Sequence, residues 1–218
     1  MLRAMIHLYG RHTSYNVQKV LWLLDEIGLP YQHSNLGGTF GGLDTDTFGQ
    51  LNPHRRVPVL TDGPTTVWES HAIIRYLAAT YSPAGLWPVE ARERAIADQW
   101  MEWATNSLMP AFGRLFWGYY RTPETQRNHA AIEATIKELT VLYRTLDDQL
   151  DGRAFLVGDA LTMADIPAGT SLYRYFEMGL TVERPANVWR WYESLRMRPA
   201  YQERVMDPFE ELYGRLAY

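Results

Sequence analysis

Apolar positions near the start of the chain follow first a strand period and then a helix period. Residues 5–9 form a short apolar run that ends at Gly10, and this run predicts a β-strand. Residues 16–27 place apolar side chains at helical spacing, and Gly28 stands where a helix C-cap belongs. The pattern predicts a strand and then an amphipathic helix whose buried face carries Val17, Val20, Leu21 and Leu24.

Residues 31–50 carry a weaker pattern. Residues 31–35 fit a second short strand. Residues 36–50 contain five glycines and show no period. We therefore expect a loop there, with a helical turn near Thr45.

The next segment predicts a hairpin followed by a helix. Two β-branched runs, 57–61 and 65–68, flank the turn signal Asp62-Gly63, and a helix begins directly afterwards at Ser70 and runs to residue 81. Pro58 has no backbone donor, so we expect it at a sheet edge or at the start of a strand. An edge strand beside a helix N-terminus can offer backbone groups to an extended peptide, and the helix end favours a carboxylate. The segment therefore predicts a binding site for a small acidic peptide.

The remainder of the chain reads as helical. Residues 82–88 are rich in turn formers and predict a connector. Residues 97–108 keep helical spacing, and Pro110 should bend or interrupt that helix. Thr122-Pro123-Glu124 predicts a helix start, and a helix should then run along 132–150.

A sharper signal lies in Thr162-Met163-Ala164-Asp165. A cap hydroxyl stands three residues before an acid that can reach back to it, which is a close variant of the capping box. Leu161 and Ile166 flank the box as a hydrophobic staple. The four-residue motif therefore predicts the first turn of another helix.

The absence of cysteine narrows the possible chemistry. The 218 residues contain no cysteine, which excludes disulfide scaffolding, thiolate metal sites and a catalytic cysteine. The six histidines do not take zinc-ligand spacing, so we expect no metal. The glycine-rich residues 37–42 lack the features of a phosphate loop or a dinucleotide site. If the protein performs thiol chemistry, the sulfur must arrive on a substrate.

Charge and hydropathy exclude further classes. The net charge of −4 argues against a nucleic-acid partner, which would favour a basic face. No apolar run is long enough to span a bilayer, and we expect no membrane partner. The first ten residues are too interrupted for a signal peptide, so we expect a cytoplasmic protein.

Several motifs together resemble the cytosolic glutathione S-transferases, in particular serine-type bacterial members related to the phi, theta and nu classes. The resemblance rests on Val57-Pro58-Val59-Leu60, on Glu69-Ser70-His71-Ala72-Ile73, on Ser14-x-Asn16-Val17, on the capping box, and on residues 184–192 and 198–201. It implies an α/β thioredoxin-like domain over residues 1–81 that binds glutathione, a linker over 82–88, and an all-α helical bundle over 89–218 with an electrophile pocket. It also implies glutathione as co-substrate, a small hydrophobic electrophile and a homodimer.

The resemblance places the catalytic hydroxyl on Ser14, beside the N-terminus of the first helix. A hydroxyl donor and a helix dipole both favour a thiolate over a thiol, whose ordinary pKa is about 8.5. Asn16 can add a second donor, although it can equally be a helix cap. Some bacterial relatives use threonine, so Thr13 remains an alternative to Ser14.

The resemblance also assigns the glutathione contacts. Glu69 and Ser70 should hold the γ-glutamyl end, the backbone of Val57 should pair with the cysteinyl unit before a cis Pro58, and Arg56 should approach the glycyl carboxylate. Arg55 occupies a position that is usually glycine in the family. It should strain the backbone or add a second cation near the carboxylate.

The electrophile side is less readable from sequence. An aromatic cluster in the second half is expected near the sulfur, although such a stripe can equally be core; its members are Phe112, Phe116, Trp117, Tyr119 and Tyr120. Two readings exist for residues 209–218, a cover over the cleft between the domains and a frayed tail, and we expect the frayed tail. The function predicted is glutathione transfer; the alternatives are disulfide reduction without a protein cysteine, and a non-catalytic glutathione-binding or ligand-binding module.

Overall fold

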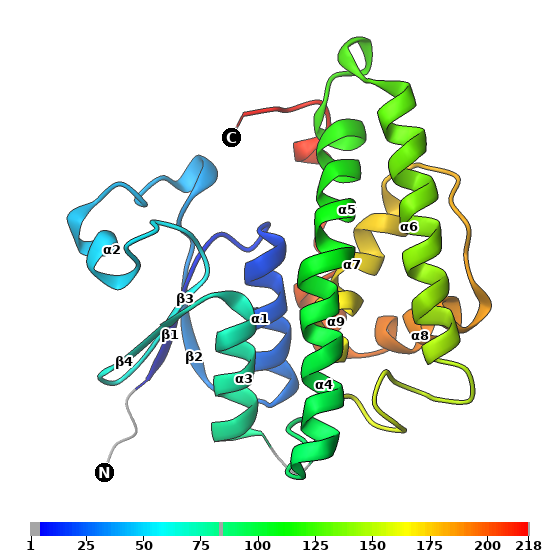
Figure 1. Ribbon diagram of the computed structural model, residues 1–218. Coiled ribbons are helices and arrows are strands. Elements are labelled where there is room, and N and C mark those ends of the chain that lie inside the picture. Colours follow the sequence, from blue (N-terminus) through cyan, green and yellow to red (C-terminus); the bar gives the residue numbers. More distant parts are fainter. Residues whose placement is uncertain (1–4, 83–84, 218) are drawn as a thin grey trace.

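A mixed four-stranded sheet forms the first half of the computed structural model, which describes residues 5–82 and 85–217 (Figure 1). The strand order is β2-β1-β3-β4, where β1 and β2 are parallel and β3 is antiparallel to both β1 and β4. The strands are β1 (Ile6–Tyr9), β2 (Tyr31–Ser34), β3 (Val59–Asp62) and β4 (Thr65–Trp68).

Helices α1 (Tyr15–Glu26) and α3 (Ser70–Tyr81) lie between this sheet and the helical half (Figure 1). Because α1 packs on α3 and also on the helical half, residues 17–24 are buried on every side. The sequence pattern predicts that only one face of this helix is buried, whereas the structure buries all of its sides over residues 17–24. The loop before β3 contains the 3₁₀ turn η1 (Gly38–Phe40) and helix α2 (Asp46–Leu51), which Thr45 caps by accepting the Phe48 N–H.

The predicted edge position of the proline strand is wrong. Strand β3 lies inside the sheet, between β1 and β4. Pro58 precedes it after a cis peptide bond with Val57, and the ladder begins only at Val59. Pro58 therefore stands at the start of the strand, which was the other position we expected. A residue without an N–H is tolerated there because the ladder of hydrogen bonds begins only after it.

The second half is helical, as predicted. Its α-helices are α4 (Ala91–Trp103), α5 (Met109–Leu115), α6 (His129–Gln149), α7 (Asp165–Glu177), α8 (Ala186–Arg196) and α9 (Pro199–Arg204). The π-helical segments η2 (Ala104–Leu108) and η3 (Phe116–Arg121) and the 3₁₀ turns η4 (Glu124–Gln126) and η5 (Glu210–Leu212) complete the described elements.

Prolines shape the helices of this half in two ways. The π-helical segment η2 interrupts the α-helical ladder just before Pro110, as expected for a residue that cannot donate to it. The predicted helix start at Thr122-Pro123-Glu124 is wrong, because those residues lead only into the short turn η4. Helix α6 begins at His129, where the Asn128 side chain accepts the Ala131 N–H at 3.0 Å.

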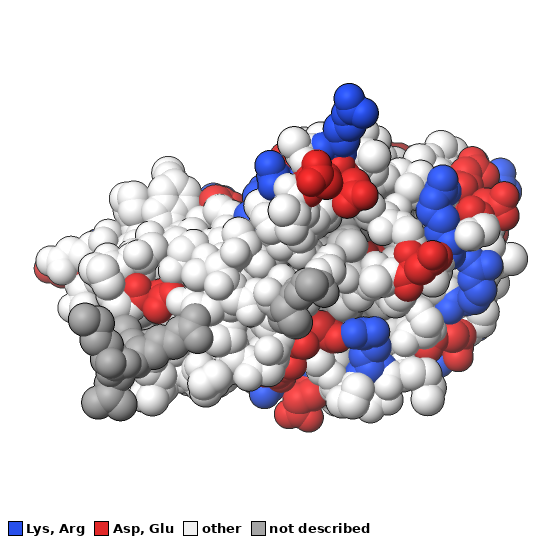
Figure 2. Space-filling view, turned by 90° about the horizontal axis from the view of Figure 1, so that it is seen from below, with Lys and Arg blue, Asp and Glu red and all other residues white. Residues whose placement is uncertain are grey.

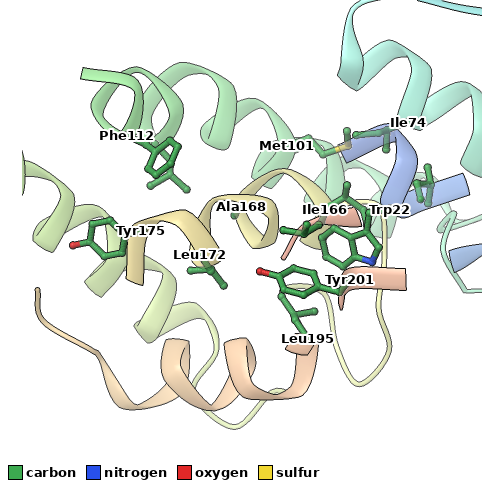
Figure 3. Packing of buried hydrophobic residues seen from close by; sticks show 14 of the residues in the cluster. Trp22, Ile74, Met101, Phe112, Ile166, Ala168, Leu172, Tyr175, Leu195 and Tyr201 are labelled. Carbon is green, nitrogen blue, oxygen red and sulfur yellow. The ribbon is translucent and has the colours of Figure 1, made fainter. Parts of the chain in front are cut away.

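Helix α7 runs through the centre of the helical half, and Trp22 from α1 packs nearby against Tyr201 (Figure 3). The predicted capping box lies just before α7, and its acidic half forms, whereas the Asp165 N–H donates to the Thr162 carbonyl and not to its hydroxyl. The Asp165 carboxylate accepts the N–H groups of Thr162 and Leu156, each at 2.9 Å. Burial raises the pKa of Asp165 to about 6, although these hydrogen bonds oppose the shift. Both staple residues, Leu161 and Ile166, belong to the buried core.

On the face seen in Figure 2, basic and acidic side chains are interspersed, and they gather mainly over the helical half. None of the helices within residues 5–82 and 85–217 is long and apolar enough to cross a membrane. Residues 83 and 84 of the predicted linker lie outside the described residues, as do residues 1–4 of the first predicted domain and residue 218.

Candidate functional site

The turn between β1 and α1 presents Ser14 at the start of the helix. Gly10 allows this turn, because a Cβ atom there would lie 2.5 Å from Val17 Cγ2. The Ser14 carbonyl accepts the N–H groups of Val17 and Gln18, so Ser14 is the N-cap residue. Its side chain makes no capping hydrogen bond within the described structure. The Ser14 hydroxyl therefore does not accept a hydrogen bond from the N–H groups in the first turn of α1.

Thr13 and Ser14 differ in exposure. Thr13 is buried, whereas Ser14 is half-exposed. Both residues line a cavity of about 710 Å³ between the two halves, together with Asn16 and Arg56. Three of the predicted site residues are therefore brought to one cavity: Ser14, Asn16 and Arg56.

A second cavity of about 390 Å³ adjoins the first, with Asn16 and Met109 on the boundary of both. Glu69 and Ser70 line it at the start of α3. Glu69 has a φ of +71°, a backbone conformation that non-glycine residues rarely adopt and that is often found at functional sites. Val57 and Pro58 are not among the described residues that line either cavity. Val57 instead packs beside Gly10.

Arg55 adopts the left-handed conformation that the usual glycine would adopt, with φ +50°. Its guanidinium donates to the carbonyl groups of Leu43 and Thr45 at 3.0 and 2.7 Å. It also packs so close to Gly49 that a Cβ there would lie 2.7 Å from Nη2. The positive φ agrees with the expected backbone strain, which stays a prediction, whereas the guanidinium donates to the loop before α2 and lines neither cavity.

A buried lysine connects the start of α1 to the start of α3. Lys19 is 3 % exposed, and its Nζ lies 3.0 Å from Asn16 Oδ1 and 3.2 Å from His71 Nε2. The Ser70 hydroxyl donates to the same Asn16 oxygen at 3.5 Å. Because Oδ1 receives both donors, the Nδ2 group of Asn16 is the end that remains to donate elsewhere.

The chain of hydrogen bonds continues from His71 to the helical half. The Thr105 hydroxyl donates to the Met101 carbonyl and lies 2.8 Å from His71 Nδ1. That hydroxyl has only one proton, so Nδ1 must donate to it and Nε2 must accept from Lys19. Burial, followed by the charges of Lys19 and Arg75, lowers the pKa of His71 to about 2, which agrees with a neutral ring.

Lys19 itself has an unusual environment. Burial lowers the pKa of Lys19 to about 7, while the charge of Glu69 opposes the shift. The ammonium also lies 4.6 Å from the centre of the Tyr15 ring. Its two polar contacts, Asn16 and His71, are neutral. A lysine so placed changes its charge readily when a ligand binds nearby.

The larger cavity has an aromatic wall on the helical half. Phe112, Phe116 and Trp117 line it, and the Phe112 and Phe116 rings stack with centroids 5.9 Å apart. Tyr119 and Tyr120 are not among the residues that line it. The predicted aromatic cluster is thus divided, with Tyr120 packed on Phe209 and Tyr213 and Tyr119 packed against Arg127.

The predicted frayed tail is wrong for residues 209–217. Phe209 is buried, and Leu212 lines the larger cavity. Arg121, which is fully buried, donates to the carbonyl groups of Arg215 and Ala217, and the Gly214 N–H donates to the Tyr120 carbonyl. These bonds fix the C-terminal segment, residues 209–217, beside the cavity.

Sequence reasoning missed Lys19, Arg174 and Leu212. Lys19 follows Ser14 by five residues and stands among apolar positions of a predicted helix, which was a signal for a buried polar role. Arg174 likewise interrupts the apolar side of α7. Leu212 gave no such signal. Within the described ranges, no group of three His, Asp or Glu side chains converges as a metal site.

Comparison with known proteins agrees with this arrangement. A family model described as "Glutathione S-transferase, N-terminal domain" matches residues 8–85, and one described as "Glutathione S-transferase, C-terminal domain" matches residues 96–199. Glutathione S-transferase GstB of Escherichia coli is 40% identical over 206 residues, which cover 94% of this chain and 99% of that protein. Glutathione S-transferase 3 of Zea mays is 31% identical over 93% of this chain and 94% of that protein.

The structure is also similar to a crystal structure of a theta class glutathione S-transferase from Xanthomonas axonopodis pv. citri with glutathione bound. The TM-score is 0.89 and the identity 43%, over 94% of this chain and 99% of that one. With the fold, the serine at the N-cap position of the first helix and the identity over nearly the whole chain in agreement, this chain belongs to the glutathione S-transferase family of enzymes.

Proposed function

We propose that the protein binds glutathione, stabilises its thiolate at Ser14, and transfers it to an electrophilic carbon. The observation that carries this proposal is Ser14, whose hydroxyl is not engaged in capping and which lines, at the N-terminus of α1, the same cavity as the aromatic residues of the helical half. The relatives' names and the glutathione-bound structure similar to this chain support the choice of ligand.

The two cavities suit the two ends of the tripeptide. The γ-glutamyl end fits the smaller cavity, where Glu69 can accept from its amine and the backbone N–H of Ser70, at the start of α3, can donate to its carboxylate. The glycyl carboxylate fits beside the exposed Arg56 in the larger cavity. The family resemblance assigns the cysteinyl unit to the backbone of Val57, which precedes the cis Pro58. This placement brings the sulfur to the start of α1.

At that position the protein stabilises the thiolate relative to the thiol. The Ser14 hydroxyl donates to the sulfur, the Nδ2 group of Asn16 is oriented by Lys19 to donate as well, and the α1 N-terminus adds its positive end. A hydrogen bond to a charged group contributes about 1.5–3 kcal/mol, which corresponds to roughly one to two pKa units. One such bond brings a thiol of pKa about 8.5 close to neutrality.

The transfer step then requires only that an electrophilic acceptor be held beside the thiolate. The thiolate sulfur donates its electron pair to the electrophilic carbon, and the leaving group departs with the electron pair of the broken bond. The aromatic wall of Phe112, Phe116 and Trp117 holds the acceptor next to the sulfur. Because the sulfur belongs to glutathione, the reaction needs no protein cysteine.

The experiment is a titration of bound glutathione by its thiolate absorbance near 240 nm in the wild type and in Ser14→Ala. We expect Ser14→Ala to raise the thiol pKa by about one to two units, since it removes one charge-assisted donor. Thr13→Val and Asn16→Ala are the matched variants. If the pKa is unchanged in Ser14→Ala and rises in Thr13→Val, the hydroxyl assignment moves to Thr13.

The two other functions are separated by substrate. A disulfide reductase would consume hydroxyethyl disulfide faster than an aryl halide, and a non-catalytic module would turn over neither. We propose the transferase as first choice because the cavity that Ser14 lines is also lined by the aromatic residues Phe112, Phe116 and Trp117. A homodimer belongs to the same proposal, and sedimentation equilibrium of the full chain tests it.

A further inference from the structure

Lys19 is a buried basic side chain beside the proposed glutathione site. It is 3 % exposed, and it lines the smaller cavity together with Glu69 and Ser70. Its Nζ donates to Asn16, which also lines the larger cavity with Ser14. In the proposed binding mode, Lys19 therefore lies at the cavity that holds the γ-glutamyl carboxylate and is connected to the thiolate through Asn16.

The hydrogen bonds of Lys19 match those of a neutral amine. Nζ lies 3.0 Å from Asn16 Oδ1 and 3.2 Å from His71 Nε2, and both of these atoms accept. A neutral amine has two N–H groups for these two acceptors, whereas an ammonium has three. Among residues 5–82 and 85–217, no third acceptor lies within hydrogen-bond distance of Nζ, although the centre of the Tyr15 ring is 4.6 Å away. A third N–H therefore gains an acceptor when a ligand carboxylate enters the smaller cavity.

The charged groups around Lys19 come from two other helices. Helix α3 and its N-cap residue contribute Arg75 and Glu69, which line the smaller cavity with Lys19. Helix α4 contributes Asp98 and Glu102, which pair with Arg75 at 2.6 Å each. The charge of Arg75 is therefore balanced by α4, whereas the Glu69 carboxylate is available to a ligand amine.

Binding of glutathione changes the charge near Lys19. The other titratable neighbours, His71 and Tyr15, are neutral, because burial lowers the pKa of His71 and raises that of Tyr15. The γ-glutamyl amine brings one positive charge to Glu69, while the γ-glutamyl carboxylate and the thiolate bring two negative charges. The region therefore becomes more negative by one charge, and added negative charge favours the protonated form of a lysine.

We infer that Lys19 takes up a proton when glutathione binds and thereby keeps in the site the proton that the thiol loses. This inference rests on the proposed function. The thiol S–H bond breaks and leaves its electron pair on sulfur, water carries the proton, and the lone pair of Nζ binds it. The resulting ammonium donates to Asn16, to His71 and to the ligand carboxylate. Lys19 is thus a positioning residue for thiol ionisation, because it acts on the sulfur through Asn16 and through its charge.

The first test counts the protons released for each thiolate that forms when glutathione binds at about pH 8, where a free thiol is still mostly protonated. Calorimetry in two buffers of different ionisation enthalpy gives the protons, and absorbance near 240 nm gives the thiolate. At this pH Lys19 of the free protein is mostly neutral, because burial lowers its pKa to about 7. We expect the wild type to release fewer than about 0.3 protons per thiolate, since Lys19 takes up the rest.

Lys19→Met removes the proton acceptor and should release about one proton per thiolate, even if it forms less thiolate than the wild type. The matched control is Lys137→Met, which removes an exposed lysine of α6 and should follow the wild type. A wild type that releases about one proton per thiolate overturns the inference. An equal ratio in the wild type and in Lys19→Met also overturns it, because another group then binds the proton.

A second measurement uses only the wild type, in case Lys19→Met does not fold. With lysine labelled with ¹³C at Cε, the Lys19 resonance should titrate near pH 7 in the free protein. Saturating glutathione should raise that midpoint by at least about one pH unit and leave Lys137 unchanged. If the wild type forms no bound thiolate, the proposed function fails and this inference fails with it. If it forms thiolate while the Lys19 midpoint stays in place, only this inference fails.

Discussion

Lys19 allows a direct test of the electrostatics beneath the site. Its ammonium is buried between neutral partners, Asn16 and His71, with the Tyr15 ring at 4.6 Å and Glu69 as the nearby opposite charge. Burial lowers the pKa of Lys19 to about 7, whereas an unfolded lysine titrates near 10.4. Between these two values the unfolded chain binds almost one proton more than the folded chain.

The sign of the effect follows from this proton difference. The free energy of unfolding rises with pH wherever the unfolded state binds more protons, so Lys19 makes the protein more stable as pH rises from 7 towards 10.4. Below pH 7 both states are protonated and the contribution no longer changes. One proton corresponds to about 1.4 kcal/mol per pH unit, so Lys19→Met should remove about 1.3 kcal/mol of the gain between pH 8 and pH 9.

The chain offers a convenient assay, because Lys19 and Lys137 are its two lysines. Lysine labelled with ¹³C at Cε gives two NMR resonances, and the exposed Lys137 serves as the internal reference. We expect the Lys19 resonance to titrate near pH 7. Urea denaturation of the wild type, Lys19→Met and Lys137→Met at pH 8 and 9 measures the stability difference.

Two results would refute this reasoning. The first is a Lys19 midpoint at the ordinary lysine value of about 10.4, which would mean that water reaches the ammonium. The second is an identical pH dependence of stability in the wild type and in Lys19→Met. Lys137→Met should follow the wild type in either case, because its side chain is exposed.

Other substitutions test the fold around the site. Asp165→Ala should lower the free energy of unfolding by about 3 kcal/mol, because two buried N–H groups lose their acceptor; urea denaturation measures this, and a loss below about 1 kcal/mol contradicts it. Arg55→Gly should be about 1 kcal/mol more stable than Arg55→Ala, since glycine accepts φ +50° without strain; equal stabilities would argue against strain. Arg121→Met should speed hydrogen exchange at the Gly214 amide at least tenfold, because the C-terminal segment loses two hydrogen bonds; unchanged exchange would show that other contacts hold it.

Much of the fold could be predicted from local chemistry. Helix α3 was predicted with both ends correct, because a clear hairpin precedes it and a proline-containing connector follows. The capping box at Asp165 was also readable, since its hydrogen bonds join residues only three apart. The start of α6 was misplaced because Thr122 and Pro123 satisfy helix-start preferences locally, while Asn128 provides the cap that the structure uses.

The candidate site was predictable only as far as neighbours in sequence form it. Ser14 and Asn16 lie in one turn, and Glu69 and Ser70 in another, so motifs could identify each pair. The contact between Arg174 and Thr13 joins residues 161 positions apart, and no local period encodes it. No local pattern encodes the C-terminal segment, residues 209–217, either. Its order depends on the buried Arg121, which lies far from it in sequence.

The position of Leu212 in the lining of the larger cavity has a consequence for the diversification of such enzymes. This residue lies beyond residue 199, where the match to the C-terminal domain family ends. A substitution at Leu212 itself changes the lining of the larger cavity, whereas Tyr201, Val205 and Phe209 of the same stretch belong to the buried core. A laboratory library that varies Leu212 and keeps those three core residues can therefore alter the cavity lining without removing the packing of Tyr201 on Trp22 of α1.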